Sequence, residues 1–204
     1  MDVIYDFETV GNNSMTAAPV CLAAFCFDRN RFVSNDPYQF KEIVSECFYE
    51  KLDFEKIIKN HNYILDKDSL KWWKGLPSDA RKQLTPSSDD LDLNEFITSF
   101  EEYLKKYKPI KYSWTRGNSY DPIVLDVMLS KATIDNSVSN ILKYWQVRDI
   151  RTWIMTKFGE DSNTRDDFVT DDFKDSFVKH LCTHDIAADL LRMQTIIRIE
   201  NNLQ

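Results

Sequence analysis

The longest apolar stretch of the chain runs from Ala17 to Phe27. A membrane-spanning helix needs about 20 consecutive apolar residues. This stretch is therefore too short to cross a bilayer, and we interpret it as a buried strand over residues 18–28. The hydrophobic content of 43% and the aromatic content of 13% are sufficient for a sizeable core, and the length of 204 residues suits a single domain, 1–204.

Strand-like and helical patterns follow one another along the chain. Predicted strands cover residues 2–6, 18–28, 41–49, 110–114 and 143–148, although the apolar positions of 41–49 also fit other periods. Predicted helices cover parts of 68–84, the amphipathic segment 93–104, a segment from Asp121 to about Leu129, one that begins at Asp149, and one that begins near His184. Residues 159–176 are rich in Asp and are predicted to form a mobile surface loop. Three strands followed by alternating helices and strands predict an α/β domain with a mixed central sheet.

The composition excludes several classes of protein. Only four glycines are present and they lie far apart, so neither a glycine-rich dinucleotide loop nor a P-loop is possible. The four cysteines form no C-x-x-C pair, which favours reduced core residues of a cytosolic protein. The N-terminus has no basic, signal-like region. The formal net charge of −7 argues against a protein that holds nucleic acid by general charge attraction.

The strongest local motif is Asp6-Phe7-Glu8, at the end of the first predicted strand. Side chains two apart on a strand project from the same face, so the two carboxylates repel each other unless a cation lies between them. A divalent metal ion, with its preference for hard oxygen ligands, meets that need. For the motif alone, two solvated carboxylates on an exposed face are the better interpretation.

Three later residues change this balance. Asp121 lies at the predicted N-cap of a helix, a position compatible both with capping alone and with metal binding. His180 and Asp185 are five residues apart, and on one helix they would point about 140° away from each other. We therefore expect His180 to precede the last helix and Asp185 to lie in its first turns. His184 is best interpreted as a helix-terminal or core residue.

Together these residues give the order D-x-E, D, H-x-x-x-x-D. This order resembles the DEDDh group of proofreading-type 3′→5′ exonucleases in the ribonuclease H-like superfamily. Further segments resemble the exonuclease A (DexA) family of T-even-type bacteriophages, over residues 2 to about 195. These segments are 4–9, 72–82, 116–123, 148–152 and 184–185.

The resemblance implies a ribonuclease H-like fold, in which a mixed central sheet is flanked by helices, and a two-metal phosphodiester hydrolysis. Asp6, Glu8, Asp121 and Asp185 would hold two Mg²⁺ or Mn²⁺ ions, and His180 would be the general base. The products would be nucleoside 5′-monophosphates. The implied partner is a single-stranded 3′ end, with DNA favoured over RNA, in the cytoplasm (the host cytoplasm if the chain is phage-encoded). The sequence gives no indication of a membrane or of an oligomeric state.

Two alternatives stay open at this point. The same site could degrade RNA, because the distinction depends on contacts to the 2′-hydroxyl. A non-catalytic nucleic-acid-binding module is the more distant alternative, although it would be expected to lack one of the acidic ligands.

Substrate contacts are expected from Thr9, Trp73 and Tyr120. Thr9 follows the D-x-E motif, and Tyr120 precedes Asp121, where it could stack on a base or cover the site. Trp72 and Trp73 diverge by about 100° on a helix, so at most one is expected to be wholly in the core and the other could stack on a base. Packing of both in the core is an equally good interpretation. Asp149 is predicted to cap a helix rather than to be a fifth ligand.

Overall fold

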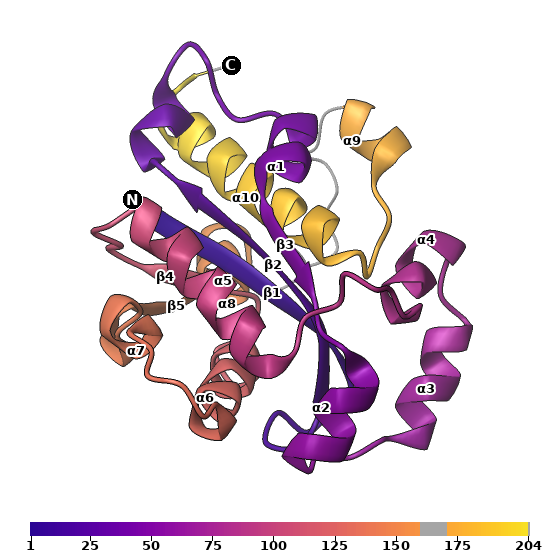
Figure 1. The fold of residues 1–204 in the computed structure, drawn as a ribbon. Coiled ribbons are helices and arrows are strands. Elements are labelled where there is room, and N and C mark those ends of the chain that lie inside the picture. Colours follow the sequence, from indigo (N-terminus) through magenta and orange to yellow (C-terminus); the bar gives the residue numbers. More distant parts are fainter. Residues whose placement is uncertain (160–170, 204) are drawn as a thin grey trace.

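The structure is a computed structural model that describes residues 1–159 and 171–203. Its strands form one mixed sheet in the order β3-β2-β1-β4-β5 (Figure 1). The central strand β1 (Asp2–Val10) pairs antiparallel with β2 (Ala18–Phe27) and parallel with β4 (Ser113–Thr115). The edges are β3 (Phe48–Lys51), antiparallel to β2, and β5 (Val147–Asp149), parallel to β4. The expected mixed sheet is thus confirmed.

Helices cover both faces of the sheet. Every residue of β2 is buried, as the apolar run predicts. On β1, Val3, Tyr5 and Phe7 face a core built with α5 (Leu93–Lys106) and α6 (Asp121–Lys131). Ile4 and Val10 face the opposite core, in which α10 (Cys182–Glu200) and α8 (Ile150–Phe158) pack. Even-numbered residues of β1 therefore point toward α10.

Shorter elements connect these layers. The α-helices among them are α1 (Phe40–Glu46), α2 (Phe54–His61), α3 (Lys67–Lys74), α4 (Ser78–Arg81), α7 (Val138–Ile141) and α9 (Asp171–Ser176). The 3₁₀ helices are η1 (Arg29–Val33), η2 (Lys82–Leu84) and η3 (Tyr144–Gln146). No helix in the described ranges is long and apolar enough to cross a membrane.

The strand predicted over residues 41–49 is wrong for most of its length. Residues 40–46 form α1, and β3 begins only at Phe48. Phe40 and Ile43 are buried and lie three residues apart, which places both on one face of a helix. Glu42 accepts a hydrogen bond from the backbone of Gln39 at the start of the helix, although at a long 3.4 Å. The helical period therefore determines the structure here.

Other boundaries also differ from the predictions. Tyr120, not Asp121, is the N-cap of α6, and Asp121 is its first residue. The predicted strand 143–148 consists mainly of the turn η3, and β5 begins at Val147. Of the predicted acidic loop, residues 160–170 lie outside the described residues, and 171–176 form α9. That helix is anchored by buried Phe173, whose ring lies edge-on to Phe40 at 5.2 Å.

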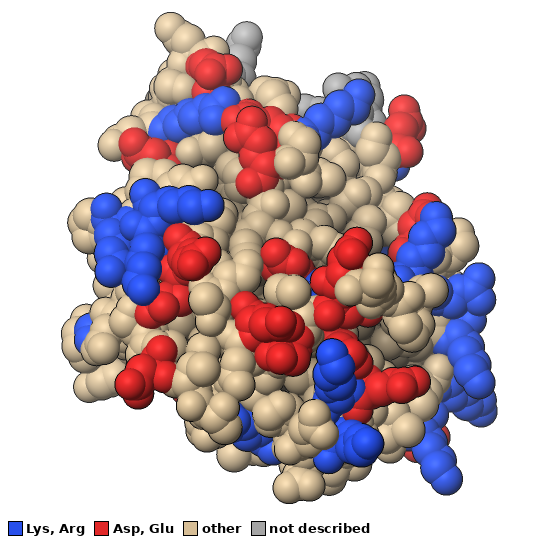
Figure 2. Space-filling model, viewed as in Figure 1, with Lys and Arg blue, Asp and Glu red and all other residues tan. Residues whose placement is uncertain are grey.

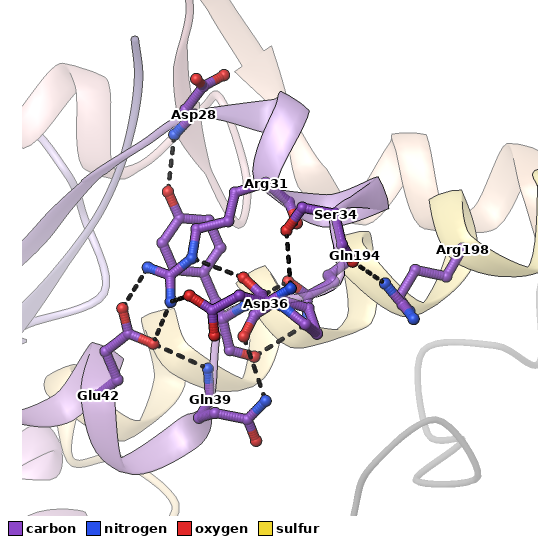
Figure 3. A network of polar contacts seen from close by, with 10 residues as sticks. Asp28, Arg31, Ser34, Asp36, Gln39, Glu42, Gln194 and Arg198 are labelled. Atoms are coloured by element: carbon purple, nitrogen blue, oxygen red, sulfur yellow. Dashed lines mark hydrogen bonds and ion pairs between the residues drawn. The ribbon is translucent and has the colours of Figure 1, made fainter. Parts of the chain in front are cut away.

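A polar network fixes the segment around η1 against α10 (Figure 3). The backbone N–H of Tyr38 donates to Oε1 of Gln194, and Nε2 of Gln194 donates to the carbonyl of Tyr38, both at 2.9 Å. Arg198 donates to the carbonyls of Phe32 and Ser34. These bonds position the helix on which Asp185 lies.

Replacing Gln194 with Ala is expected to lower the free energy of unfolding by about 2–4 kcal/mol, because it leaves the buried N–H and C=O of Tyr38 without a partner. Urea denaturation measures this loss. The control Asn201→Ala, at the exposed end of the same helix, should cost less than about 1 kcal/mol. Equal losses in the two variants would contradict the assigned role of Gln194.

Candidate active site

All five predicted catalytic residues line one cleft of about 910 Å³. Asp6 and Glu8 lie on β1, Asp121 begins α6, and His180 and Asp185 lie on either side of the start of α10. The cleft thus collects residues from three parts of the chain that the fold brings to one side of the central strand.

The local structure explains each position. Asp6 and Glu8 share the face of β1 that carries Ile4 and points toward α10, because successive even-numbered side chains of a strand lie on one face. His180 has a left-handed backbone (φ 64°) just before α10, and its backbone N–H donates to the carboxylate of Asp185 in the first turn. The prediction that His180 precedes the helix and Asp185 lies within it is confirmed.

The carboxylate of Asp121 is held by the backbone of the central strand. Its Oδ1 accepts a hydrogen bond of 3.1 Å from the N–H of Phe7. The bond spans from the first residue of α6 to the residue between Asp6 and Glu8. Asp121 is therefore placed beside the D-x-E motif by the sheet itself, instead of acting as a helix cap.

Glu8, His180 and Asp185 form a candidate metal site. One ligand atom from each lies within 4.8 Å of the other two, and this group stands out among the described residues. Two carboxylates and an imidazole are suitable ligands for a divalent ion. Asp6 and Asp121 line the same cleft but lie outside this close group.

The buried carboxylates of the cleft have raised pKa values, although the charges of Arg116 and Arg192 oppose the shift at Asp185. Burial, followed by the charge of Asp189, raises the pKa of Asp185 to about 7, and burial raises the pKa of Asp121 to about 7. The pKa values of Asp6 and Glu8 also lie well above their ordinary range, through burial and then through neighbouring ionisable groups. A bound cation would relieve this repulsion, so the charge distribution fits a metal site.

The two histidines near α10 have different surroundings. Burial, and then the charge of Lys179, lowers the pKa of His180, so its imidazole is neutral at pH 7 and can accept a proton. His184 instead accepts a hydrogen bond of 3.0 Å from the N–H of Val178 through Nδ1, and its ring packs edge-on against Phe40. The structural interpretation of His184 agrees with these contacts.

A buried glutamine supports the segment that carries His180. Gln83, only 3% exposed, donates from Nε2 to the carbonyl of His180 at 2.7 Å. Its Oε1 accepts hydrogen bonds from the thiols of Cys21 and Cys182 and a long bond from the N–H of Cys182. Gln83 therefore fixes the chain on both sides of Leu181. Nothing in the sequence around position 83 indicates this role.

Two other aspartates near the cleft have structural roles. Asp189 accepts from Arg192 at 3.1 Å and also pairs with Arg116, a partner that the sequence does not indicate. Asp149 accepts a hydrogen bond of 3.1 Å from the N–H of Thr152, and so caps α8 as predicted.

A smaller hollow of about 610 Å³ adjoins the cleft and shares Glu8 and Tyr120 with it. The hydroxyls of Thr9 and Tyr120 lie 2.6 Å apart, and that of Tyr120 also donates to the carbonyl of Gly11. Trp72 also lines this hollow, and its ring lies edge-on to that of His180, with the centroids 4.8 Å apart.

The placement of Trp73 corrects its predicted role in base stacking. Trp73 is 1% exposed, and its Nε1 donates to the carbonyl of Thr9, whereas Trp72 is 48% exposed. Leu70, Trp73 and Leu76 are three residues apart and all belong to the core facing α10. A spacing of three residues is typical of the buried face of a helix, so it identifies Trp73 as the inward ring and leaves Trp72 for the hollow.

Comparison with known proteins identifies the family. The model of the 3′-5′ exoribonuclease Rv2179c-like domain matches residues 1–185. The chain belongs to this family. The exonuclease is also 33% identical to the exodeoxyribonuclease of Enterobacteria phage T4, over an alignment of 223 residues that takes in all of this chain and 92% of the relative. Family membership and this full-length similarity make the chain a 3′→5′ exonuclease.

Solved structures support the fold of the exonuclease. A moderately thermophilic exonuclease I from Methylocaldum szegediense superposes with a TM-score of 0.62 at 14% identity, and the alignment covers 98% of this chain and 40% of that one. One chain of a structure of the yeast NOT1 MIF4G domain co-crystallized with CAF1 gives a TM-score of 0.56 at 14% identity, and the alignment covers 98% of this chain and 80% of that one. The expected ribonuclease H-like arrangement of sheet and helices is confirmed.

The raised carboxyl pKa values predict how stability depends on pH without metal. Between about pH 4 and pH 7 the folded protein retains protons on Asp121 and Asp185 that the unfolded chain loses. These groups therefore lower the free energy of unfolding as pH rises through this window. In EDTA, we expect the melting temperature of the wild-type protein to fall between pH 5 and pH 8 relative to that of Asp185→Asn. Addition of Mn²⁺ at pH 8 should raise the melting temperature of the wild-type protein.

The matched control for this measurement is Asp149→Asn, which removes a carboxylate whose role is helix capping. Its melting temperature should keep the wild-type pH dependence and the wild-type response to Mn²⁺. A wild-type curve parallel to that of Asp185→Asn would show that Asp185 is ionised equally in the folded and unfolded states.

Proposed function

We propose that this exonuclease removes nucleoside 5′-monophosphates from the 3′ end of single-stranded DNA. The observation that carries the proposal is the convergence of Asp6, Glu8, Asp121, His180 and Asp185 on one cleft in a member of this family. DNA is favoured because the full-length T4 relative is an exodeoxyribonuclease. RNA remains the second candidate substrate, because the description of the family model refers to an exoribonuclease.

Asp6, Glu8, Asp121 and Asp185 would hold two Mg²⁺ or Mn²⁺ ions. Their raised pKa values and the close approach of Glu8 to Asp185 support this assignment, and His180, the third member of that close group, is assigned to proton transfer instead of metal binding. When bound, such ions stabilise the attacking and leaving oxygens of the phosphodiester. Two of the arginines that line the cleft, Arg116 and Arg192, pair with Asp189.

His180 is the proposed general base. Its neutral imidazole takes a proton from the attacking water as the oxygen bonds to phosphorus. The bond from phosphorus to the 3′ oxygen of the penultimate nucleotide breaks, and this oxygen keeps the electron pair and takes a proton from water to become the new 3′-hydroxyl. The terminal nucleotide leaves as a 5′-monophosphate. Gln83 holds the backbone carbonyl of His180, and the ring of Trp72 lies edge-on to the imidazole, which favours one position for proton transfer.

The hollow formed by Thr9, Tyr120 and Trp72 is the proposed pocket for the terminal nucleoside. Its lining includes the carboxylates of Glu8, Asp66 and Asp68, and none of the described residues that line it is Lys or Arg. A 3′-terminal nucleoside carries no phosphate on its 3′ side, so an acidic wall can accept hydrogen bonds from its hydroxyl without repelling a phosphate. The exposed face of Trp72 is available for stacking on the base.

Surface charge supports local recognition of the strand. Figure 2 shows acidic side chains in the middle of one face and many basic side chains at its edges, including the edge formed by α3 and α4. A net charge of −7 provides no general attraction for a polyanion. Binding is therefore proposed to depend on metal ions and on contacts at the strand end.

Asp6→Asn and Asp185→Asn test the metal ligands. Each variant should hydrolyse end-labelled single-stranded DNA at least about 100-fold more slowly than wild type, because each removes a charged ligand while keeping the shape of the side chain. Asp149→Asn is the control and should retain the wild-type rate. A near wild-type rate for either ligand variant would disprove the site.

The general base is tested by comparing His180→Ala with His184→Ala. The first should lower kcat by about 10²–10⁴-fold with little change in melting temperature. The second should mainly lower the melting temperature, because His184 accepts from Val178 and packs on Phe40. The reverse pattern would move the base to His184.

Product analysis distinguishes the substrate classes. Wild type with Mg²⁺ should release mononucleotides from the 3′ end of single-stranded DNA faster than from RNA of the same sequence. A faster reaction on RNA would favour the second candidate. The absence of both hydrolysis and Mn²⁺ binding by calorimetry would indicate a non-catalytic binding module.

A further inference from the structure

A third hollow, of about 590 Å³, adjoins the catalytic cleft and shares none of the lining residues of the hollow at Trp72. Tyr5 lines both this hollow and the cleft. The loop 117–122 lies between them. Of its residues, Asn118 lines the hollow, whereas the cleft is lined by Gly117, Ser119 and Tyr120. We call this hollow the aromatic site and define it by Tyr5, Ser113, Asn118, Lys143, Tyr144 and Trp145. None of these residues has a role in the chemistry described above.

The rim of the aromatic site exposes two large rings side by side. Tyr144 is 85% exposed and Trp145 is 59% exposed, and their rings lie edge-to-face with centroids 5.0 Å apart. Lys143 lies next to them, with Nζ 5.9 Å from the centre of the Trp145 ring. Exposed aromatic faces beside a cation are the combination that binds single-stranded nucleic acids, since bases stack on the rings and phosphates pair with the cation.

The turn that carries the rings is held firmly. Gln146 accepts from the N–H of Lys143 at 2.6 Å and donates to the carbonyl of Ile110 at 2.7 Å. Arg148 donates to the carbonyls of Trp145 and Val147. These bonds present the rings outward before any ligand binds, which reduces the conformational entropy that binding would cost.

The floor of the aromatic site holds an unsatisfied polar group. Ser113 is 0% exposed to solvent, and its hydroxyl has no hydrogen-bond partner within residues 1–159 and 171–203. A buried hydroxyl without a partner destabilises the folded state, so a ligand group that reached Ser113 from the hollow would supply the missing bond. The volume is within the range of small-molecule sites.

We infer that the aromatic site binds a nucleotide of the substrate strand on the 5′ side of the scissile phosphate. The inference rests on the proposed function, and charge supports the direction of the strand. The hollow at Trp72 is acidic and suits the 3′ terminus of the strand, which carries no phosphate there. The aromatic site contains Lys143 as well as Asp126. The strand would thus run from the aromatic site, across the carboxylates, to the pocket at Trp72.

The first test is the double variant Tyr144→Ala/Trp145→Ala. KM for a single-stranded 12-mer should rise about fivefold to 100-fold, because stacking on one base is lost, while kcat stays unchanged. Inhibition by a 5′-mononucleotide, which fills only the terminal pocket, should keep its wild-type constant. Ile199→Ala, which removes an exposed apolar side chain at the far end of α10, is the control and should change neither value.

The second test is Ser113→Ala, in which stability and KM together distinguish a ligand contact from a purely structural residue. Removing the unpaired hydroxyl should leave the midpoint of urea denaturation unchanged or raise it. The same variant should raise KM for the 12-mer about threefold to tenfold. Loss of stability without a change in KM would assign Ser113 to the fold alone and overturn its role as a ligand contact.

The outcomes separate this inference from the proposed function. If wild type hydrolyses the 12-mer but the double variant, folded by circular dichroism, has the same KM, only the aromatic site is disproved. If mononucleotide inhibition weakens as much as 12-mer binding, the site takes free nucleotides and the assignment to the strand is overturned. If wild type hydrolyses no strand of DNA or RNA, the proposed function itself fails.

Discussion

Repulsion among partly buried carboxylates is the constraint around which this structure is organised. Asp6, Glu8, Asp121 and Asp185 line one cleft, and burial together with neighbouring ionisable groups raises their pKa values. Such an arrangement persists without a cation only if packing elsewhere holds it in place. The two cores on either face of β1, and the hydrogen bond from Phe7 to Asp121, provide that support.

The topology determines which carboxylates meet. The face of β1 that carries Asp6 and Glu8 is covered by α10, so the first turn of that helix brings Asp185 to them. The rest of α10 is fixed at a distance by Gln194 and Arg198, which bond to the chain around η1. Contacts far from the cleft therefore control its geometry, and Gln83 performs the same task close to His180.

Much of this could be predicted from the sequence, and the exceptions have physical reasons. The apolar run 17–27, the capping role of Asp149 and the break between His180 and Asp185 follow from local rules that tertiary contacts do not override. The strand predicted at 41–49 failed because a short apolar segment fits more than one period. Gln83 and the pairing of Arg116 with Asp189 depend on contacts between distant segments, which leave no local pattern.

The acidity of the chain and its proposed affinity for a polyanion are compatible because the balance of charge differs from one hollow to the next. Carboxylates gather where cations would neutralise them, and the proposed pocket at Trp72 is acidic where a bound strand would have no phosphate on its 3′ side. At the aromatic site, two rings and a lysine are the main exposed groups. A strand that bound in the reverse direction would place phosphates beside Asp66 and Asp68 and its terminus beside Lys143. Local charge thus favours one polarity of binding where the net charge favours none.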